Sequence, residues 1–233
     1  MKKLILSAIA CVLLVLPITA LGAKTTAIDP GKLQNLGTTM IDKRTAAIQK
    51  YDGLLNQTKY ISDATLSKVQ GELSRVKGEL ETLKTKILGE TDIDALKADV
   101  KSIATNYRVY QVFLPQSAGI ISVDRMKTYE VKLTELKSKI SIKADELEQA
   151  GKDVSAIRNL ISTAEGNISA GNGYITTSES KFTSMAITDP EGARTLKLDG
   201  RTALISAKQS FSEARKNMRD AVQEIKKLAQ PSI

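Results

Sequence analysis

Few side chains in this sequence have the chemistry of catalysis, and they are not grouped along the chain. The chain contains no histidine, and its single cysteine is Cys11, near the N-terminus. Without histidine it lacks the most frequent general base and the most frequent metal ligand of proteins. Histidine-based triads, cysteine proteases and typical zinc sites are therefore excluded. The chemistry that remains would use carboxylates, serine–lysine pairs or tyrosines.

Carboxylates and serine–lysine neighbours are abundant, but their spacing does not favour catalysis. Glu79 and Glu81 are two positions apart, so on a helix they point to different sides. Neighbours such as Ser67 and Lys68 are common in a chain that is rich in both types. We therefore predict that the protein is not an enzyme and that it holds no catalytic residues, metal ion, cofactor or small-molecule substrate.

The segment 106–115 is the most distinctive one in a chain with only 4% aromatic residues. It combines two tyrosines, a phenylalanine, an arginine and a terminal proline. Tyr107, Arg108 and Tyr110 are candidates for a partner contact, because Tyr and Arg are favoured at binding hot spots. The alternative, which we favour, is structural: both tyrosines continue a series of apolar residues at steps of three and four and would pack at the end of a bundle.

The second candidate surface is the basic segment 194–227. It carries nine Lys and Arg residues against four Asp and Glu, an excess of 9 − 4 = 5 positive charges. Arg215, Lys216 and Arg219 are clustered within it. Such a surface suits an acidic protein, an anionic envelope polymer or a membrane surface. The alternative, which we favour, is the solvated face of a bundle helix. Nucleic acid is not expected, since aromatic stacking residues are sparse.

The first 23 residues are typical of a secretory signal peptide. Two lysines precede an apolar run over residues 4–16, and the small residues before Lys24 predict cleavage after Ala23. We therefore expect an exported protein that is periplasmic, cell-surface associated or extracellular. Without the signal peptide the chain has no cysteine, so its stability must come from packing rather than disulfides. Its net charge falls from +8 to 32 − 26 = +6.

Two other interpretations of the N-terminus stay open. An uncleaved membrane anchor needs about 20 apolar residues, a length that is reached here only by including Pro17 and Thr19. A lipoprotein cleaved before Cys11 would keep an apolar stretch, residues 12–23, at its mature N-terminus. Both interpretations fit the residues less well than a cleaved signal peptide.

Apolar residues recur at steps of three and four almost throughout the rest of the chain, and no segment alternates as a strand does. Caps and breakers predict six helices, whose expected limits are about 30–60, 63–89, 93–114, 123–151, 154–185 and 190–230. Pro115 is expected to end the third helix, and Gly171 and Gly173 to weaken or kink the fifth. The fold predicted is all-α: an elongated antiparallel helical bundle or coiled-coil rod of about six helices.

This pattern predicts two helical regions behind the signal peptide (1–23). The first covers 24–115 and the second 123–233, each with three helices. The connection 116–122, which contains Gly119, is the expected hinge. Strict heptad spacing, as in 66–87, serves pairing within one chain or between chains equally well, so a homo-oligomer stays open.

Several stretches carry a resemblance to known proteins. They are 91–103, Tyr107-Arg108-Val109-Tyr110, Leu114-Pro115-Gln116, Asp124-Arg125 and 150–156. Through them the chain resembles an uncharacterised family of exported bacterial all-helical, coiled-coil-like proteins. The resemblance implies export and an all-helical fold, but no activity or site residues.

The expected function is a non-catalytic, structural or binding role in the cell envelope or outside the cell. The partner would be a protein, an anionic envelope polymer or a membrane surface. The alternative is a holdase-type chaperone of the periplasm or exterior, which would enclose unfolded chains with coiled-coil arms.

Overall fold

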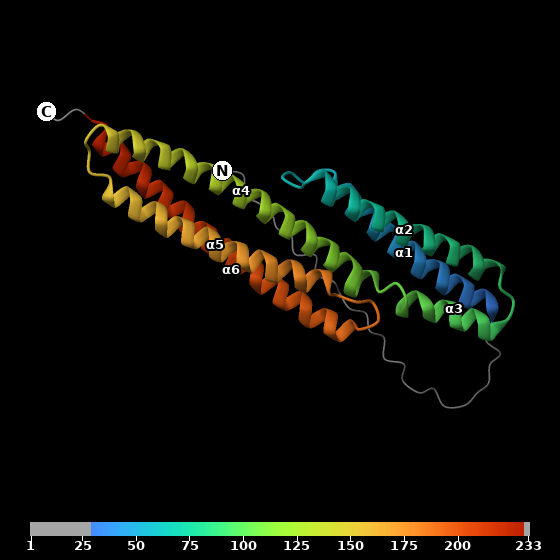
Figure 1. The fold of residues 1–233 in the computed structure, drawn as a ribbon. Coiled ribbons are helices and arrows are strands. Elements are labelled where there is room, and N and C mark those ends of the chain that lie inside the picture. Colours follow the sequence, from blue (N-terminus) through green and yellow to red (C-terminus); the bar gives the residue numbers. More distant parts are fainter. Residues whose placement is uncertain (1–28, 231–233) are drawn as a thin grey trace.

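The computed structural model describes residues 29–230, and within them all regular structure is helical. The predicted all-α, elongated bundle is thereby confirmed (Figure 1). The elements in chain order are α1 (Pro30–Leu55), α2 (Asp63–Gly89), α3 (Ile93–Thr105), the π-helical turn η1 (Val109–Phe113), α4 (Leu114–Gln149), α5 (Ser155–Thr183) and α6 (Pro190–Leu228). The segment 1–23, for which a signal peptide with cleavage after Ala23 is predicted, lies outside the described residues.

The buried side chains form two clusters. The helices that contribute them form two groups, which are displaced from one another along the molecule (Figure 1). The first core joins α1, α2 and α3 to η1 and the first turns of α4. The second core joins most of α4 to α5 and α6. Ile121 is buried in the first core and Val123 in the second, while Ile120 packs against both. One helix, α4, therefore belongs to both bundles.

Helix starts follow the local sequence closely. The Asp29 carboxylate accepts a hydrogen bond from the Gly31 N–H at 2.9 Å, and the Asp92 carboxylate accepts one from the Ala95 N–H at 2.7 Å. Asp189 caps α6 in the same way, through the Gly192 N–H. These side chains satisfy N–H groups that have no partner inside the first helical turn.

Helix α1 ends earlier than predicted, at Leu55 rather than near Tyr60. Thr58 N–H bonds to the Leu55 carbonyl at 2.9 Å, and Tyr60 adopts a left-handed φ of +65°. A residue with this backbone cannot continue a right-handed helix. The chain turns here into α2, which Ser62 caps as predicted.

The prediction for the segment around Pro115 is wrong. The third helix, α3, ends at Thr105 rather than at Leu114, and Pro115 lies in the first turn of α4 instead of terminating a helix. The π-helical turn η1 leads directly into this position, and the Leu114 N–H bonds the Val109 carbonyl, so the proline stands where the wider π-helical turn passes into the α-helix. The expected hinge, 116–122, is consequently a regular part of α4.

Gly119 and Gly171 permit close helix contacts rather than bends. A Cβ at position 119 would lie 2.1 Å from Cδ1 of Phe182, and one at position 171 would lie 2.3 Å from Cε1 of Phe211. Both phenylalanines are almost fully buried. The expectation at residues 171–173 was a weakened or kinked helix, and α5 runs through them without interruption, as one helix from Ser155 to Thr183.

The tip of the α1–α2 hairpin is fastened to α4 by one carboxylate. Asp124 accepts hydrogen bonds from the Ser62 N–H at 2.6 Å, from the Ser62 hydroxyl at 2.8 Å and from the Thr65 hydroxyl at 2.9 Å. Its negative charge also lies at the N-terminus of α2, where the helix dipole favours an anion. Nearby, Lys132 Nζ lies 3.9 Å from the centre of the Tyr60 ring.

Candidate functional site

The junction between α3 and α4 carries the first group of predicted contact residues, but it separates the two tyrosines. Tyr107 faces α2, whereas the Tyr110 hydroxyl donates to the Lys43 carbonyl of α1 at 2.8 Å. The Arg44 guanidinium lies 5.7 Å from the centre of the Tyr110 ring. The two rings thus contact different helices and do not form a single patch.

Arg108 lies between these tyrosines in a strained conformation. Its φ is +33°, in the left-handed region that a residue with a side chain seldom adopts. Its guanidinium donates to Oε1 of Gln111 at 3.2 Å, while its buried Nε finds no hydrogen-bond partner among the described residues. Together with the π-helical turn that follows, this conformation redirects the chain between the two bundles.

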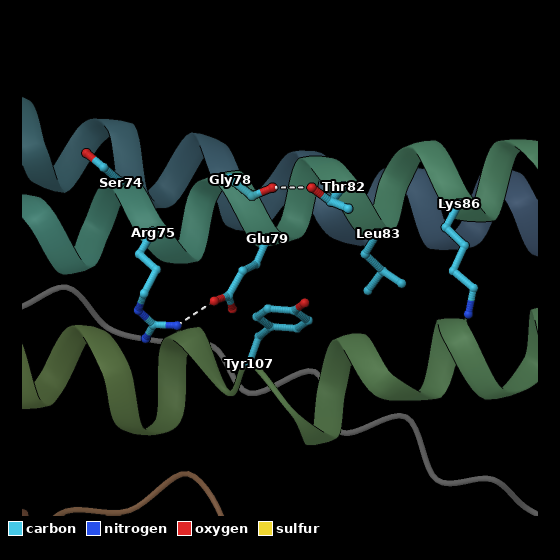
Figure 2. A pocket seen from close by; sticks show the side chains of 8 residues that line it. All are labelled: Ser74, Arg75, Gly78, Glu79, Thr82, Leu83, Lys86 and Tyr107. Carbon is cyan, nitrogen blue, oxygen red and sulfur yellow. Dashed lines mark hydrogen bonds and ion pairs between the residues drawn. The ribbon is translucent and has the colours of Figure 1, made fainter.

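Tyr107 lines an open groove of about 540 Å³ along α2 (Figure 2). The other lining residues are Ser74, Arg75, Gly78, Glu79, Thr82, Leu83 and Lys86. Figure 2 shows the Tyr107 ring beside the Glu79 and Leu83 side chains, with Arg75 and Lys86 toward the two ends of the groove. Of the predicted contact residues, Tyr107 lines this groove.

The charged groups of the groove are already paired with one another or with neighbours. Arg75 pairs with Glu79 at 2.6 Å and with Glu72 at 2.9 Å, and the hydrogen bonds that it donates to these two carboxylates raise the pKa of Arg75. At the other end Lys86 pairs with the largely buried Asp99 at 2.7 Å, which raises the pKa of Lys86.

The tyrosine of the groove is poorly suited to act as a base. Burial, followed by the nearby Glu79 charge, raises the pKa of Tyr107 above its usual value near 10. The phenol therefore stays protonated at neutral pH and can only donate or accept a hydrogen bond. The arrangement offers polar contacts to a partner but no activated nucleophile.

The second predicted group lies on α6, where Arg215, Lys216 and Arg219 are exposed. None of the three forms an ion pair with another residue of the range 29–230. The sequence therefore located these three cations correctly on a solvent-facing helix surface. It did not reveal the Asp124 contact, because the groups that Asp124 binds lie about 60 residues earlier in the chain.

No group of three or more Asp and Glu side chains in residues 29–230 is arranged to hold a metal ion. None of the helices described combines the length and apolar character needed to cross a bilayer.

Comparison with known proteins adds no further assignment. No family model matches this sequence, and no curated protein or solved structure is significantly similar to it.

Proposed function

We propose that the protein is exported and serves as a non-catalytic helical rod that binds or spaces components of the cell envelope. The observation that carries this proposal is the shared helix α4, which joins two hydrophobic cores in series. At about 1.5 Å per residue, the 36 residues of α4 and the 39 residues of α6 correspond to about 54 and 58 Å. A packed rod of this kind keeps surfaces at its two ends a fixed distance apart.

The chemistry of the groove supports a binding role over a catalytic one. Its ionisable side chains are engaged in ion pairs such as Arg75–Glu79, and the raised pKa of Tyr107 keeps that phenol neutral. Export is supported by the signal-peptide pattern that ends at Ala23. The partner would be a protein, an anionic envelope polymer or a membrane surface.

A holdase chaperone is the second candidate function. It is favoured by large aliphatic side chains that are half exposed or more, among them Leu88 at 57% and Ile142 at 57%. Such side chains could hold apolar segments of an unfolded chain. We rank this function second because these residues lie on several different helices instead of lining one enclosed cavity.

Two measurements on purified residues 24–233 separate these functions. The first is co-sedimentation with isolated envelope fractions, and the second is aggregation of a chemically unfolded client protein. A binding rod should sediment with the envelope and leave aggregation unchanged. Suppressed aggregation without envelope binding would instead establish the holdase, and failure in both assays would refute both proposals.

A further inference from the structure

The outward face of α6 carries a continuous line of side chains at a heptad spacing. We call this line the outer stripe. Its members are Arg194, Leu198, Arg201, Ile205, Lys208, Ser212, Arg215, Arg219 and Lys226. They fall into two series with steps of seven, one beginning at Arg194 and the other at Leu198, and all of them are exposed. Residues repeated every seven positions share one face of a helix.

The outer stripe lies opposite the surface by which α6 packs. Buried positions of α6 repeat with the same period, at Gly200, Ala207, Ala214 and Ala221. Each follows a member of the Leu198 series by two positions, which on an α-helix is a rotation of about 200°. The outer stripe is therefore turned away from α4 and α5, and folding leaves it uncovered.

The positive charge of the outer stripe is not neutralised within the described fold. It holds six cations, and none of them forms an ion pair with another residue of 29–230. Acidic residues of α6 lie on a flank of the helix, and two of them have other partners. Asp199 bonds Lys181 at 3.2 Å, and Glu224 bonds Lys227 at 2.6 Å. The charge of the outer stripe thus remains available to an external anion.

Two aliphatic side chains between the cations distinguish among anionic partners. Leu198 is 53% exposed and Ile205 is 66% exposed, the largest exposed fraction among the large hydrophobic residues within 29–230. A soluble polyanion offers them no apolar environment. The interface of a bilayer does, and long cationic side chains there keep their charges at the phosphates while their stems lie in the apolar layer.

The length of the outer stripe also fits a planar surface. From Arg194 to Lys226 it spans 32 steps of about 1.5 Å, or about 48 Å. A second copy of the chain is a poor occupant, because two outer stripes would bring like charges together. We propose that the outer stripe binds a bilayer containing anionic phospholipid and lays the rod lengthwise on it. This inference rests on the proposed binding function and identifies the partner.

The test is binding of residues 24–233 to vesicles of phosphatidylcholine alone or with phosphatidylglycerol. The charge variant is Arg201→Gln, Lys208→Gln and Arg215→Gln together. Its matched control is Lys50→Gln, Lys68→Gln and Lys101→Gln, which removes the same charge from exposed positions of the first bundle. Each cation near an anionic surface contributes about fivefold in affinity. The charge variant should therefore lose at least about tenfold, and the control less than about threefold.

A second variant, Leu198→Gln with Ile205→Gln, tests the aliphatic contribution. It should weaken vesicle binding several-fold and leave binding to soluble polyphosphate unchanged. Equal losses in the charge variant and its control would overturn the inference, since net charge alone would then explain binding. Polyphosphate binding as tight as vesicle binding, with no effect of the aliphatic variant, would overturn it in favour of a polymer. Sedimentation with envelope fractions but not with anionic vesicles would refute the lipid partner and leave the proposed function standing.

Discussion

At the scale of single residues, Arg108 combines two unfavourable features at the point where the chain passes from α3 to α4. Its left-handed φ of +33° carries a strain of about 1–3 kcal/mol for a residue other than glycine. Its buried Nε adds the cost of a hydrogen-bond donor without a partner in the described residues. Backbone strain of this kind persists only where the surrounding packing holds it.

Replacing Arg108 with asparagine should therefore stabilise the protein. Asparagine tolerates the left-handed region, and the substitution removes the buried Nε. We expect the free energy of unfolding in urea to rise by about 1 kcal/mol. The control, Arg125→Asn, lies in the regular helix α4 and should lower it by about 0.5 kcal/mol. A loss of stability in Arg108→Asn would contradict this account of the junction.

The burial of Tyr51 predicts that the folded protein loses stability at alkaline pH. Burial raises the pKa of this tyrosine in the folded protein well above its unfolded value near 10. The contribution of the Tyr51 phenol to the free energy of unfolding is fully present below pH 10. It is lost as the pH rises from there toward the folded pKa, because over this range the tyrosine ionises in the unfolded chain but not in the folded protein. Urea unfolding at pH 8 and pH 11 should show a smaller alkaline loss in Tyr51→Phe than in the wild type.

The surface tyrosine Tyr174 provides the comparison for that measurement. It is 43% exposed, so Tyr174→Phe removes a tyrosine hydroxyl from the surface and leaves the buried core unchanged. An identical loss in both variants would show that Tyr51 does not contribute to the pH dependence.

At the scale of elements, helix α5 contains two glycines that the sequence makes equivalent and the structure does not. A Cβ at position 171 would collide with the buried Phe211 ring, whereas one at position 173 meets nothing within 4 Å. Gly171→Ala should cost about 1–3 kcal/mol of stability through overpacking. Gly173→Ala should add about 0.5–1 kcal/mol, because alanine is the better helix former. Thermal unfolding should show a lower midpoint temperature for Gly171→Ala and a higher one for Gly173→Ala. Equal shifts of the midpoint in the same direction would refute this explanation.

The sequence predicts those features of the helices that depend on neighbouring residues, and it fails where a feature depends on residues elsewhere in the chain. Starts such as Asp29-Pro30 and Asp189-Pro190 are correct because a cap depends on residues within one turn. The role of Pro115 was misjudged because proline occurs both after a helix and in its first turn, and the left-handed Arg108 decides between them. The roles of Gly119 and Gly171 depend on Phe182 and Phe211, which come from other parts of the chain.

The candidate contact residues show a similar division. Arg215, Lys216 and Arg219 lie on an exposed helix face, as expected. The sequence allows this prediction because the apolar residues that α6 buries recur at regular helical spacing. Tyr107 and Tyr110 were expected to extend one series. The break between Thr105 and Val109, with its left-handed Arg108, changes the rotation between the two tyrosines, and no local sequence pattern indicates it.

At the scale of the whole molecule, Asp124 connects the tip of the α1–α2 hairpin to α4, the helix that both bundles share. Asp124→Ala removes three hydrogen bonds, two of them to Ser62. Because the site is partly exposed, we expect a loss of about 1–2 kcal/mol in urea unfolding. Amide hydrogen exchange should quicken at the start of α2 and remain unchanged in α5.

Asp63→Ala is the matched control for this prediction. It removes the same charge from the first turn of α2, and the helix dipole accounts for only about 0.5 kcal/mol of stability there. If the two variants were equally destabilised, charge at the helix terminus rather than attachment to α4 would explain the effect.

The sharing of α4 between the two cores also implies an order of assembly. The first core needs only residues up to Ile121, whereas the second needs α5 and α6, which are synthesised later. A chain that emerges N-terminus first can close its first bundle while the second is still missing. That closed bundle then presents the rest of α4 as a template, on which the last two helices pair as they appear.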